Sequence, residues 1–152
     1  MEVARTIKEP DEKARALSSI ASALAQAERL EEALEVARTI EGPWEKAGAL
    51  SSVASALAQA ERFDEALEVA RDIEVPLRKA EALSSVAGAW MGMGREKRAL
   101  AIAQEAIRAA RYAERGDAFS FLGSFAPVLA SFGPGVLAET WRLVEEVESW
   151  WG

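Results

Sequence analysis

The chain repeats itself every 33 residues, and this period constrains the fold more than any other feature. Residues 4–36 and 37–69 are identical at 26 of 33 positions, and residues 70–102 keep 17 of 33 against the second copy. A period of about 20–50 residues is typical of repeat arrays, in which each unit buries its apolar face only against its neighbours. The sequence therefore predicts an extended array of similar units and not a globule around one pocket.

Two helices are expected in each unit. In the first copy, apolar residues at 17, 20, 21 and 24 fall at i, i+3, i+4 and i+7, which is one face of a helix, and a second apolar set follows after a turn near Glu28. Pro10, Pro43 and Pro76 recur at the period, where proline suits the first turn of the next helix. The composition is rich in Ala and Leu, so we expect an all-α protein with nine helices, over residues 2–8, 11–26, 29–41, 44–59, 62–74, 77–92, 95–113, 116–131 and 136–150.

The units divide one domain of 152 residues. The chain begins with a half unit, three full units follow, and a divergent, aromatic-rich unit is expected to cap the C-terminal end, with boundaries at 1–10, 11–43, 44–76, 77–113 and 114–152. Pro127 lies inside the helix expected over 116–131, where a proline removes a hydrogen bond and favours a kink or a break.

The unit resembles the tetratricopeptide repeat, a helix-turn-helix unit of about 34 residues. Small and apolar residues stand at its signature places: Leu17, Ile20, Ala21 and Leu24 in the first helix, Ala33 and Ala37 in the second, and Pro43 near the closing proline. The resemblance implies a right-handed α-solenoid whose concave groove, lined by the first helix of each unit, holds a protein or peptide partner. HEAT-like and pentatricopeptide-like arrays share the pairing of helices and stay open as alternatives.

When the groove positions of the family are transferred onto this chain, most of them carry small side chains and nearly all are uncharged. Only Arg15 is available for a basic clamp on a peptide's terminal carboxylate. Such a wall suits an inserted helix or an extended apolar segment, or it serves only to let neighbouring helices pack closely. The predicted groove residues are Arg15, Ser18, Ser22, Gln26, Ser51, Ser55, Gln59, Glu81, Ser84 and Met91.

Several kinds of chemistry are excluded or disfavoured by composition. The chain has no Cys and no His, which removes disulfides, thiolate chemistry and His-based acid–base catalysis, and a Ser nucleophile would depend on Lys13 or Lys46. A net charge of −7 argues against nucleic-acid binding. We expect no metal and no cofactor, and we interpret the acidic clusters at the starts of the second helices as solvated faces. Since no apolar run is long enough to span a membrane and no signal peptide is recognisable, we expect a cytoplasmic protein.

The leading functional hypothesis is therefore a non-enzymatic scaffold that binds another protein in its groove. The alternative is self-assembly through the half unit and the aromatic C-terminus, with Val3, Ile7, Trp150 and Trp151 as the assembly surface. The locally basic stretch over residues 95–115 either receives an acidic peptide or phosphate, or pairs with its own interleaved Glu96, Glu105 and Glu114 along the helix.

Overall fold

The described structure is entirely helical. The computed structural model describes residues 7, 9–133 and 142. In these residues there are seven α-helices and no strand: α2 (Pro10–Gln26), α3 (Leu30–Arg38), α4 (Pro43–Gln59), α5 (Phe63–Arg71), α6 (Pro76–Gly92), α7 (Glu96–Ala110) and α8 (Arg115–Ala130). The all-α prediction is confirmed. The helices expected over 2–8 and 136–150 fall almost entirely outside the described residues.

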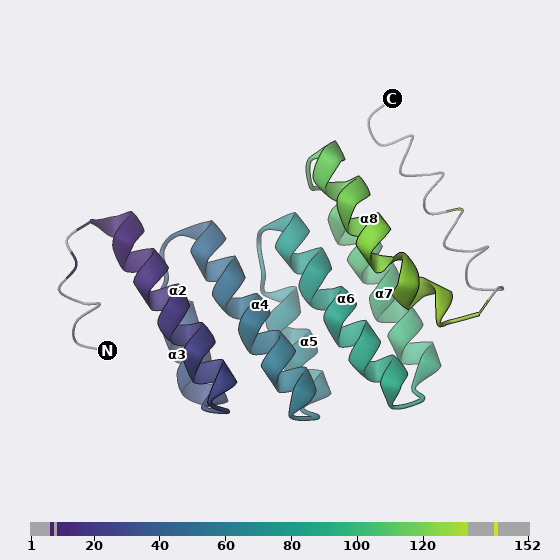
Figure 1. Ribbon diagram of the computed structural model, residues 1–152, viewed down its shortest axis with the longest axis horizontal. Helices are drawn as coiled ribbons and strands as arrows, with labels where there is room; N and C mark the ends of the chain where they lie inside the picture. The colour runs from purple at the N-terminus through teal and green to yellow at the C-terminus, as the bar shows by residue number, and fades with distance from the viewer. Residues whose placement is uncertain (1–6, 8, 134–141, 143–152) are drawn as a thin grey trace.

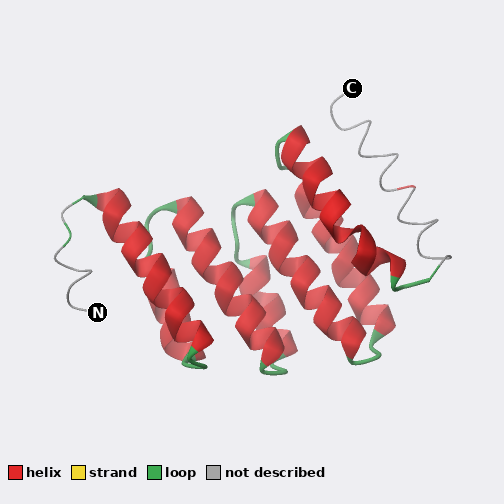
Figure 2. Ribbon diagram, in the orientation of Figure 1, coloured by secondary structure: helices red, strands yellow, loops and turns green. Residues whose placement is uncertain are grey.

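The helices lie in two layers (Figure 1). The first helices of the units, α2, α4 and α6, stand side by side in front, and the second helices, α3, α5 and α7, lie behind them. Each first helix contacts its own second helix and the next first helix, and α8 packs against α6 and α7. Short loops join successive helices (Figure 2). Each layer therefore exposes one face, and the two faces carry different residues.

Each first helix begins at the recurring proline, one residue earlier than the apolar pattern predicts. Pro10, Pro43 and Pro76 occupy the first turn after an extended residue, and no side chain caps the three starts. The second helices α3 and α5 end at Arg38 and Arg71, three residues before the predicted ends. A proline disfavours the helical region of the backbone for the residue before it, and the four residues before each next first helix, 39–42 and 72–75, form a connection.

The turn inside each unit has the same geometry in all three copies. The chain enters the left-handed region at Glu28 and Glu61, each with φ of 60°, and at Gly94, with φ of 71°. In the first copy the amide of Glu28 donates to the carbonyl of Ala25, and the next amide donates to the carbonyl of Leu24. This is the Schellman pattern of hydrogen bonds that ends a helix, and glycine is the residue that adopts it without strain.

One continuous apolar core runs between the layers. Its largest fully buried side chains are Ile40, Val53, Ile73, Leu83, Val86 and Ile107. Alanines with no exposed area, among them Ala21, Ala33 and Ala54, let helices approach closely. The end of α6 differs from the earlier units because Trp90 replaces their leucine. Its ring packs against Phe63 with ring centroids 5.3 Å apart.

The last described helix adds aromatic side chains to the core, while a C-terminal cap stays a prediction because most of residues 134–152 lie outside the described part. Phe121 and Phe125 are buried in α8, and their rings stack with centroids 5.4 Å apart. Of the two outcomes expected at Pro127, the break is wrong, because α8 runs from Arg115 to Ala130 through it, and the kink stays a prediction. Pro127 lies in the last turn and is exposed, so its missing amide hydrogen removes one hydrogen bond near the helix end and leaves the buried turns intact.

Candidate functional site

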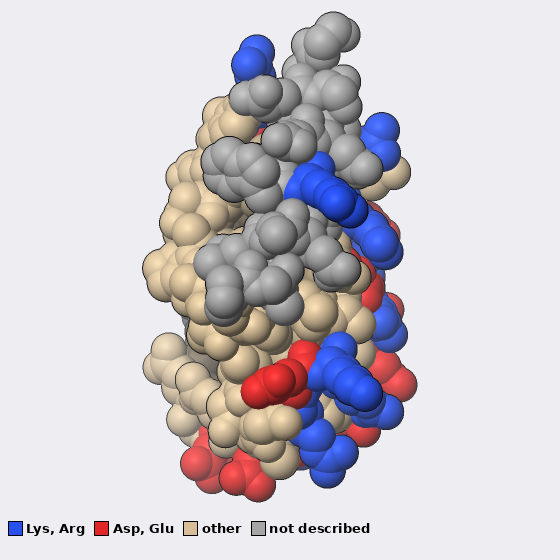
Figure 3. Space-filling view, turned by 90° about the vertical axis from the view of Figure 1, so that its right-hand side faces the viewer, with Lys and Arg blue, Asp and Glu red and all other residues tan. Residues whose placement is uncertain are grey.

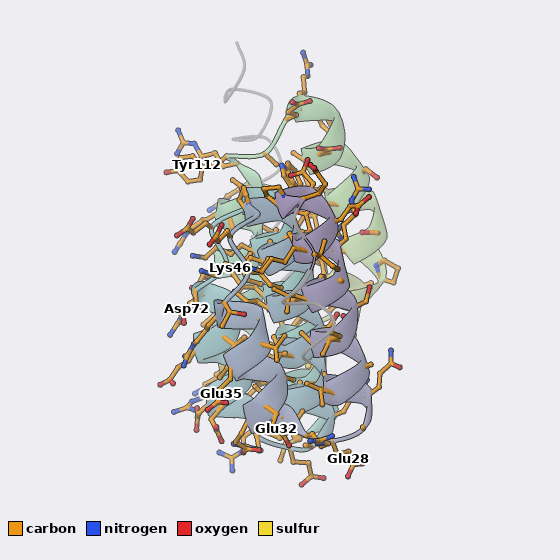
Figure 4. The ribbon with its side chains drawn as sticks, turned by 90° about the vertical axis from the view of Figure 1, so that its left-hand side faces the viewer. Glu28, Glu32, Glu35, Lys46, Asp72 and Tyr112 are labelled. Carbon is orange, nitrogen blue, oxygen red and sulfur yellow. The ribbon has the colours of Figure 1, made fainter. Side chains whose placement is uncertain are left out.

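The two faces of the molecule differ strongly in charge. Figure 3 shows acidic and basic side chains gathered along the side of the second helices, while the side of the first helices is largely free of them. Figure 4, from the opposite end, shows the same division, with Glu35 and Asp72 on the charged side. The face that belongs to α2, α4 and α6 is therefore the less charged one, and we call it the neutral face.

Ion pairs that join successive second helices account for much of the charged face. Arg62 of the second unit bonds Glu31 of the first at 2.6 Å and Glu65 of its own helix at 2.7 Å. These hydrogen bonds lower the pKa of both carboxyls. The acidic clusters at these helix starts thus face arginines, and within the described part of the chain no three acidic residues gather as metal ligands would.

A cavity of about 420 Å³ lies on the neutral face between α2 and α4. We call it the first-helix cavity. Half of the predicted groove residues line it: Ser22, Gln26, Ser51, Ser55 and Gln59. The other lining residues were not predicted: Ala25, Glu28, Leu30, Ser52, Ala56 and Ala60. The other predicted groove residues, Arg15, Ser18, Glu81, Ser84 and Met91, do not line it.

Serine hydroxyls connect the neighbouring first helices around this cavity. The hydroxyl of Ser22 donates to Ser52 at 3.1 Å, and the hydroxyls of Ser55 and Ser85 lie 3.5 Å apart, one unit further along. Ser52 also donates to the carbonyl of Gly48 at 3.2 Å. The predicted alternative, that small residues serve close packing of the first helices, therefore describes part of what these serines do. Ser52 and Ser85 were not predicted, although each is the second member of a repeated Ser–Ser pair.

Other polar groups of the first-helix cavity have no partner in the described residues. Gln26 and Gln59 are exposed and form no hydrogen bond there, and neither does the half-buried Ser51. The two glutamines occupy the same place in consecutive units, so their amides recur along the cavity. Each amide offers two donors and one acceptor oxygen, the complement of a polypeptide backbone.

An exposed tryptophan was also missed by the sequence interpretation. Trp44 keeps 59% of its surface exposed. It stands one turn before Gly48, on the face of α4 that continues to Ser51 and Ser55. The signal was present, because Trp44 and Gly48 replace Asp11 and Arg15 of the otherwise almost identical first unit. The two substitutions remove both charges from this face.

The third unit does not extend the polar cavity. Glu81 accepts a hydrogen bond from Arg78 at 3.0 Å, and its carbonyl accepts one from Ser84 at 2.8 Å. Met91, at the place of Ala25 and Ala58, packs against the core, and Gly92 stands where the earlier helices carry their glutamine. Of the predicted assembly surface, Ile7 is half-buried beside Pro10 and Leu17. Val3, Trp150 and Trp151 lie outside the described residues, so assembly stays a prediction.

Two charged residues of the basic stretch, Arg98 and Glu105, bond to the preceding unit and not along their own helix. Arg98 bonds Asp64 of α5 at 3.1 Å, and its guanidinium lies 4.9 Å from the centroid of the Trp90 ring. Glu105 accepts two hydrogen bonds from Arg71 of α5, at 2.9 and 2.8 Å. The partners are one unit away because second helices of neighbouring units stack side by side. This arrangement leaves Arg108 without a bonded partner in the described residues.

Two further findings concern membrane-spanning helices and similarity to known proteins. Within the described part of the chain, no helix combines the length and the apolar character needed to cross a membrane. Comparisons with protein-family models, with curated proteins and with solved structures find no match to this chain.

Proposed function

We propose that this protein is a non-catalytic scaffold, a right-handed α-solenoid of the tetratricopeptide type that binds a segment of another protein in a concave groove formed by its first helices. The observation that carries the proposal is the first-helix cavity of about 420 Å³, whose glutamine amides have no partner in the described residues. The serine hydroxyls of this face bond to one another and to main-chain carbonyls, which argues against a nucleophilic role for them.

The chemistry of the groove favours a largely uncharged segment. Among the residues that line the first-helix cavity Glu28 alone is charged, so an acidic side chain placed there would lose hydration without meeting an opposite charge. The amides of Gln26 and Gln59 can hydrogen-bond the carbonyl and amide groups of an extended backbone or the end of a helix. Trp44 adds exposed aromatic area next to Gly48, where an apolar side chain of the partner finds room.

The test combines an unbiased selection with a charge substitution that preserves shape. Peptides selected from a random library on the intact protein should be neutral and apolar at their centres. The variant Gln26→Glu/Gln59→Glu removes two sets of donors and adds two charges at nearly constant volume. We expect it to weaken binding of the selected peptides by about tenfold or more.

A matched control is available because the chain has one further glutamine. Gln104 lies in α7, outside the first-helix cavity, so Gln104→Glu makes the same chemical change elsewhere. We expect this control to bind like the wild type. Equal affinities for the double variant and the wild type would rule out the groove as the binding surface, and the absence of any selected peptide would argue against the scaffold itself.

A further inference from the structure

A second kind of hollow recurs at the connection between one unit and the next, away from the first-helix cavity. Each example contains the recurring proline and the lysine three residues later, and the volumes rise along the chain from about 130 Å³ at Pro10, through about 330 Å³ at Pro43, to about 490 Å³ at Pro76. The last, which we call the Tyr112 hollow, is large enough for a small organic molecule.

The Tyr112 hollow is larger because the third unit carries a longer second helix. α7 has 15 residues, whereas α3 and α5 have nine each. The extension adds Ala109 and Tyr112 to a floor made of Ile73 and Pro76. Tyr112 keeps 76% of its surface exposed and points away from the body of the molecule (Figure 4). Tyr112 nevertheless lines the hollow, and neither of the other two hollows has an aromatic side chain in its lining.

Three cations surround one carboxylate in this hollow. Arg71 holds Glu105 through two hydrogen bonds, and Lys79 donates to the main-chain carbonyl of Arg71 at 2.6 Å. Lys79, Arg108 and Glu105 line the same hollow, and the pKa of Glu105 is lowered first by the hydrogen bonds from Arg71 and further by the positive charges of Lys79 and Arg108. With Glu105 already bonded to Arg71, two positive charges stay uncompensated at this wall.

Two further carboxylates line the hollow, so its cations and carboxylates are equal in number, but they lie on different segments. Lys79 and Arg108 lie on α6 and α7, whereas Asp72 and Glu74 lie in the connection between α5 and α6 and also line the neighbouring hollow together with Arg38 and Lys46. The start of α6 adds a partial positive charge from its free amides. Its first turn contains no acidic residue, in contrast to the first turns of α2 and α4.

We propose that the Tyr112 hollow binds a small organic anion, in which a carboxylate or phosphate group lies between Lys79 and Arg108 and an apolar body rests against Ile73, Pro76 and the Tyr112 ring. The site is separate from the first-helix cavity and shares no residue with it. Binding here is therefore independent of the proposed groove function.

The single tyrosine of the chain makes the site directly observable. In protein labelled at the tyrosine ring, NMR shows one set of ring signals, all from Tyr112. Phenyl phosphate and benzoate serve as probes, with inorganic phosphate and benzyl alcohol as comparators that each carry only half of the proposed chemistry. We expect saturable shifts of the Tyr112 signals with a Kd of about 1 mM or tighter for at least one probe, and binding at least tenfold weaker for both comparators.

Substitutions then separate this hollow from its neighbour. Arg108→Gln removes a cation that has no bonded partner in the described residues, so it leaves the fold undisturbed, and we expect it to weaken probe binding about tenfold. Lys79→Gln should act in the same direction. Lys46→Gln, at the same place in the preceding unit, should have no effect. Absence of saturable shifts, or equal affinities for wild type, Arg108→Gln and Lys79→Gln, would overturn the proposal, as would equal loss in Lys46→Gln.

Discussion

Glycine at the turn inside each unit should stabilise the protein. The left-handed residue of this turn is glutamate in the first two units, Glu28 and Glu61, and glycine in the third, Gly94. All three donate the same turn hydrogen bond, so the backbone does not change along the array. The double substitution Glu28→Gly/Glu61→Gly therefore makes the first two turns chemically like the third.

The size of the effect follows from two opposing contributions. A side chain in the left-handed region costs about 1–2 kcal/mol, which glycine removes. Glycine in turn loses about 0.4–1 kcal/mol more conformational entropy on folding. The net gain is about 0.5–1 kcal/mol at each turn, and the double variant should gain about 1–2 kcal/mol. For a chain of this length, that corresponds to a rise in Tm of about 2–8 °C.

The assay is thermal and urea unfolding followed by circular dichroism. Two control variants accompany it, and both are expected to be less stable than the wild type. Glu35→Gly places glycine on the exposed surface of α3, where the backbone is helical (Figure 4). It should cost about 1 kcal/mol. Gly94→Ala puts a side chain back into the left-handed turn and should also destabilise. If Glu28→Gly/Glu61→Gly lowered Tm as Glu35→Gly does, the assignment of these turns as strained would be refuted.

Three other substitutions test separate parts of the structure. Gly48→Ala should raise the free energy of unfolding by about 0.5–1 kcal/mol, because a Cβ there comes no closer than 3.9 Å to a neighbour, and a loss in urea unfolding would contradict that packing. Leu83→Ala should cost about 2–5 kcal/mol, since Leu83 has no exposed surface, and a loss under 1 kcal/mol would refute its place in the core. Glu105→Gln should lose about 1 kcal/mol at pH 7, because Glu105 is bonded twice by Arg71. The pKa of Glu105 is lowered in the folded state, so its contribution to the free energy of unfolding is complete above its ordinary pKa and disappears as pH falls through the lowered value. Urea unfolding at pH 7 and near pH 2 should therefore show that the stability difference between Glu105→Gln and the wild type shrinks at low pH.

The repeat explains why helices were predictable and why their ends were less so. Apolar spacing inside one copy identifies both helices, and the recurring prolines mark the starts of first helices within one residue. The second helices were drawn too long because Ile40 and Ile73 continue the apolar pattern and are buried, although they lie in the connection after the helix. Burial alone does not distinguish a helical residue from a buried connection residue.

Contacts between units could not be predicted from the spacing of residues within one unit. Arg71 and Glu105 are 34 residues apart, and their pairing depends on how neighbouring second helices stack. Trp44 was overlooked for a different reason. It follows the proline at the start of a helix and belongs to no apolar row, so only the comparison between the first two copies marks it. Only half of the predicted groove residues line the first-helix cavity, because this cavity forms between α2 and α4 and does not continue along α6.

The most direct test of the groove uses side-chain amide signals in an NMR spectrum. The chain has three glutamines and no asparagine, so only three such pairs exist: those of Gln26, Gln59 and Gln104. On titration with a peptide selected on this protein, the account predicts that the amides of Gln26 and Gln59 shift and saturate together while that of Gln104 stays unchanged. Saturable peptide binding that leaves Gln26 and Gln59 unmoved, or that shifts Gln104 alone, would contradict it.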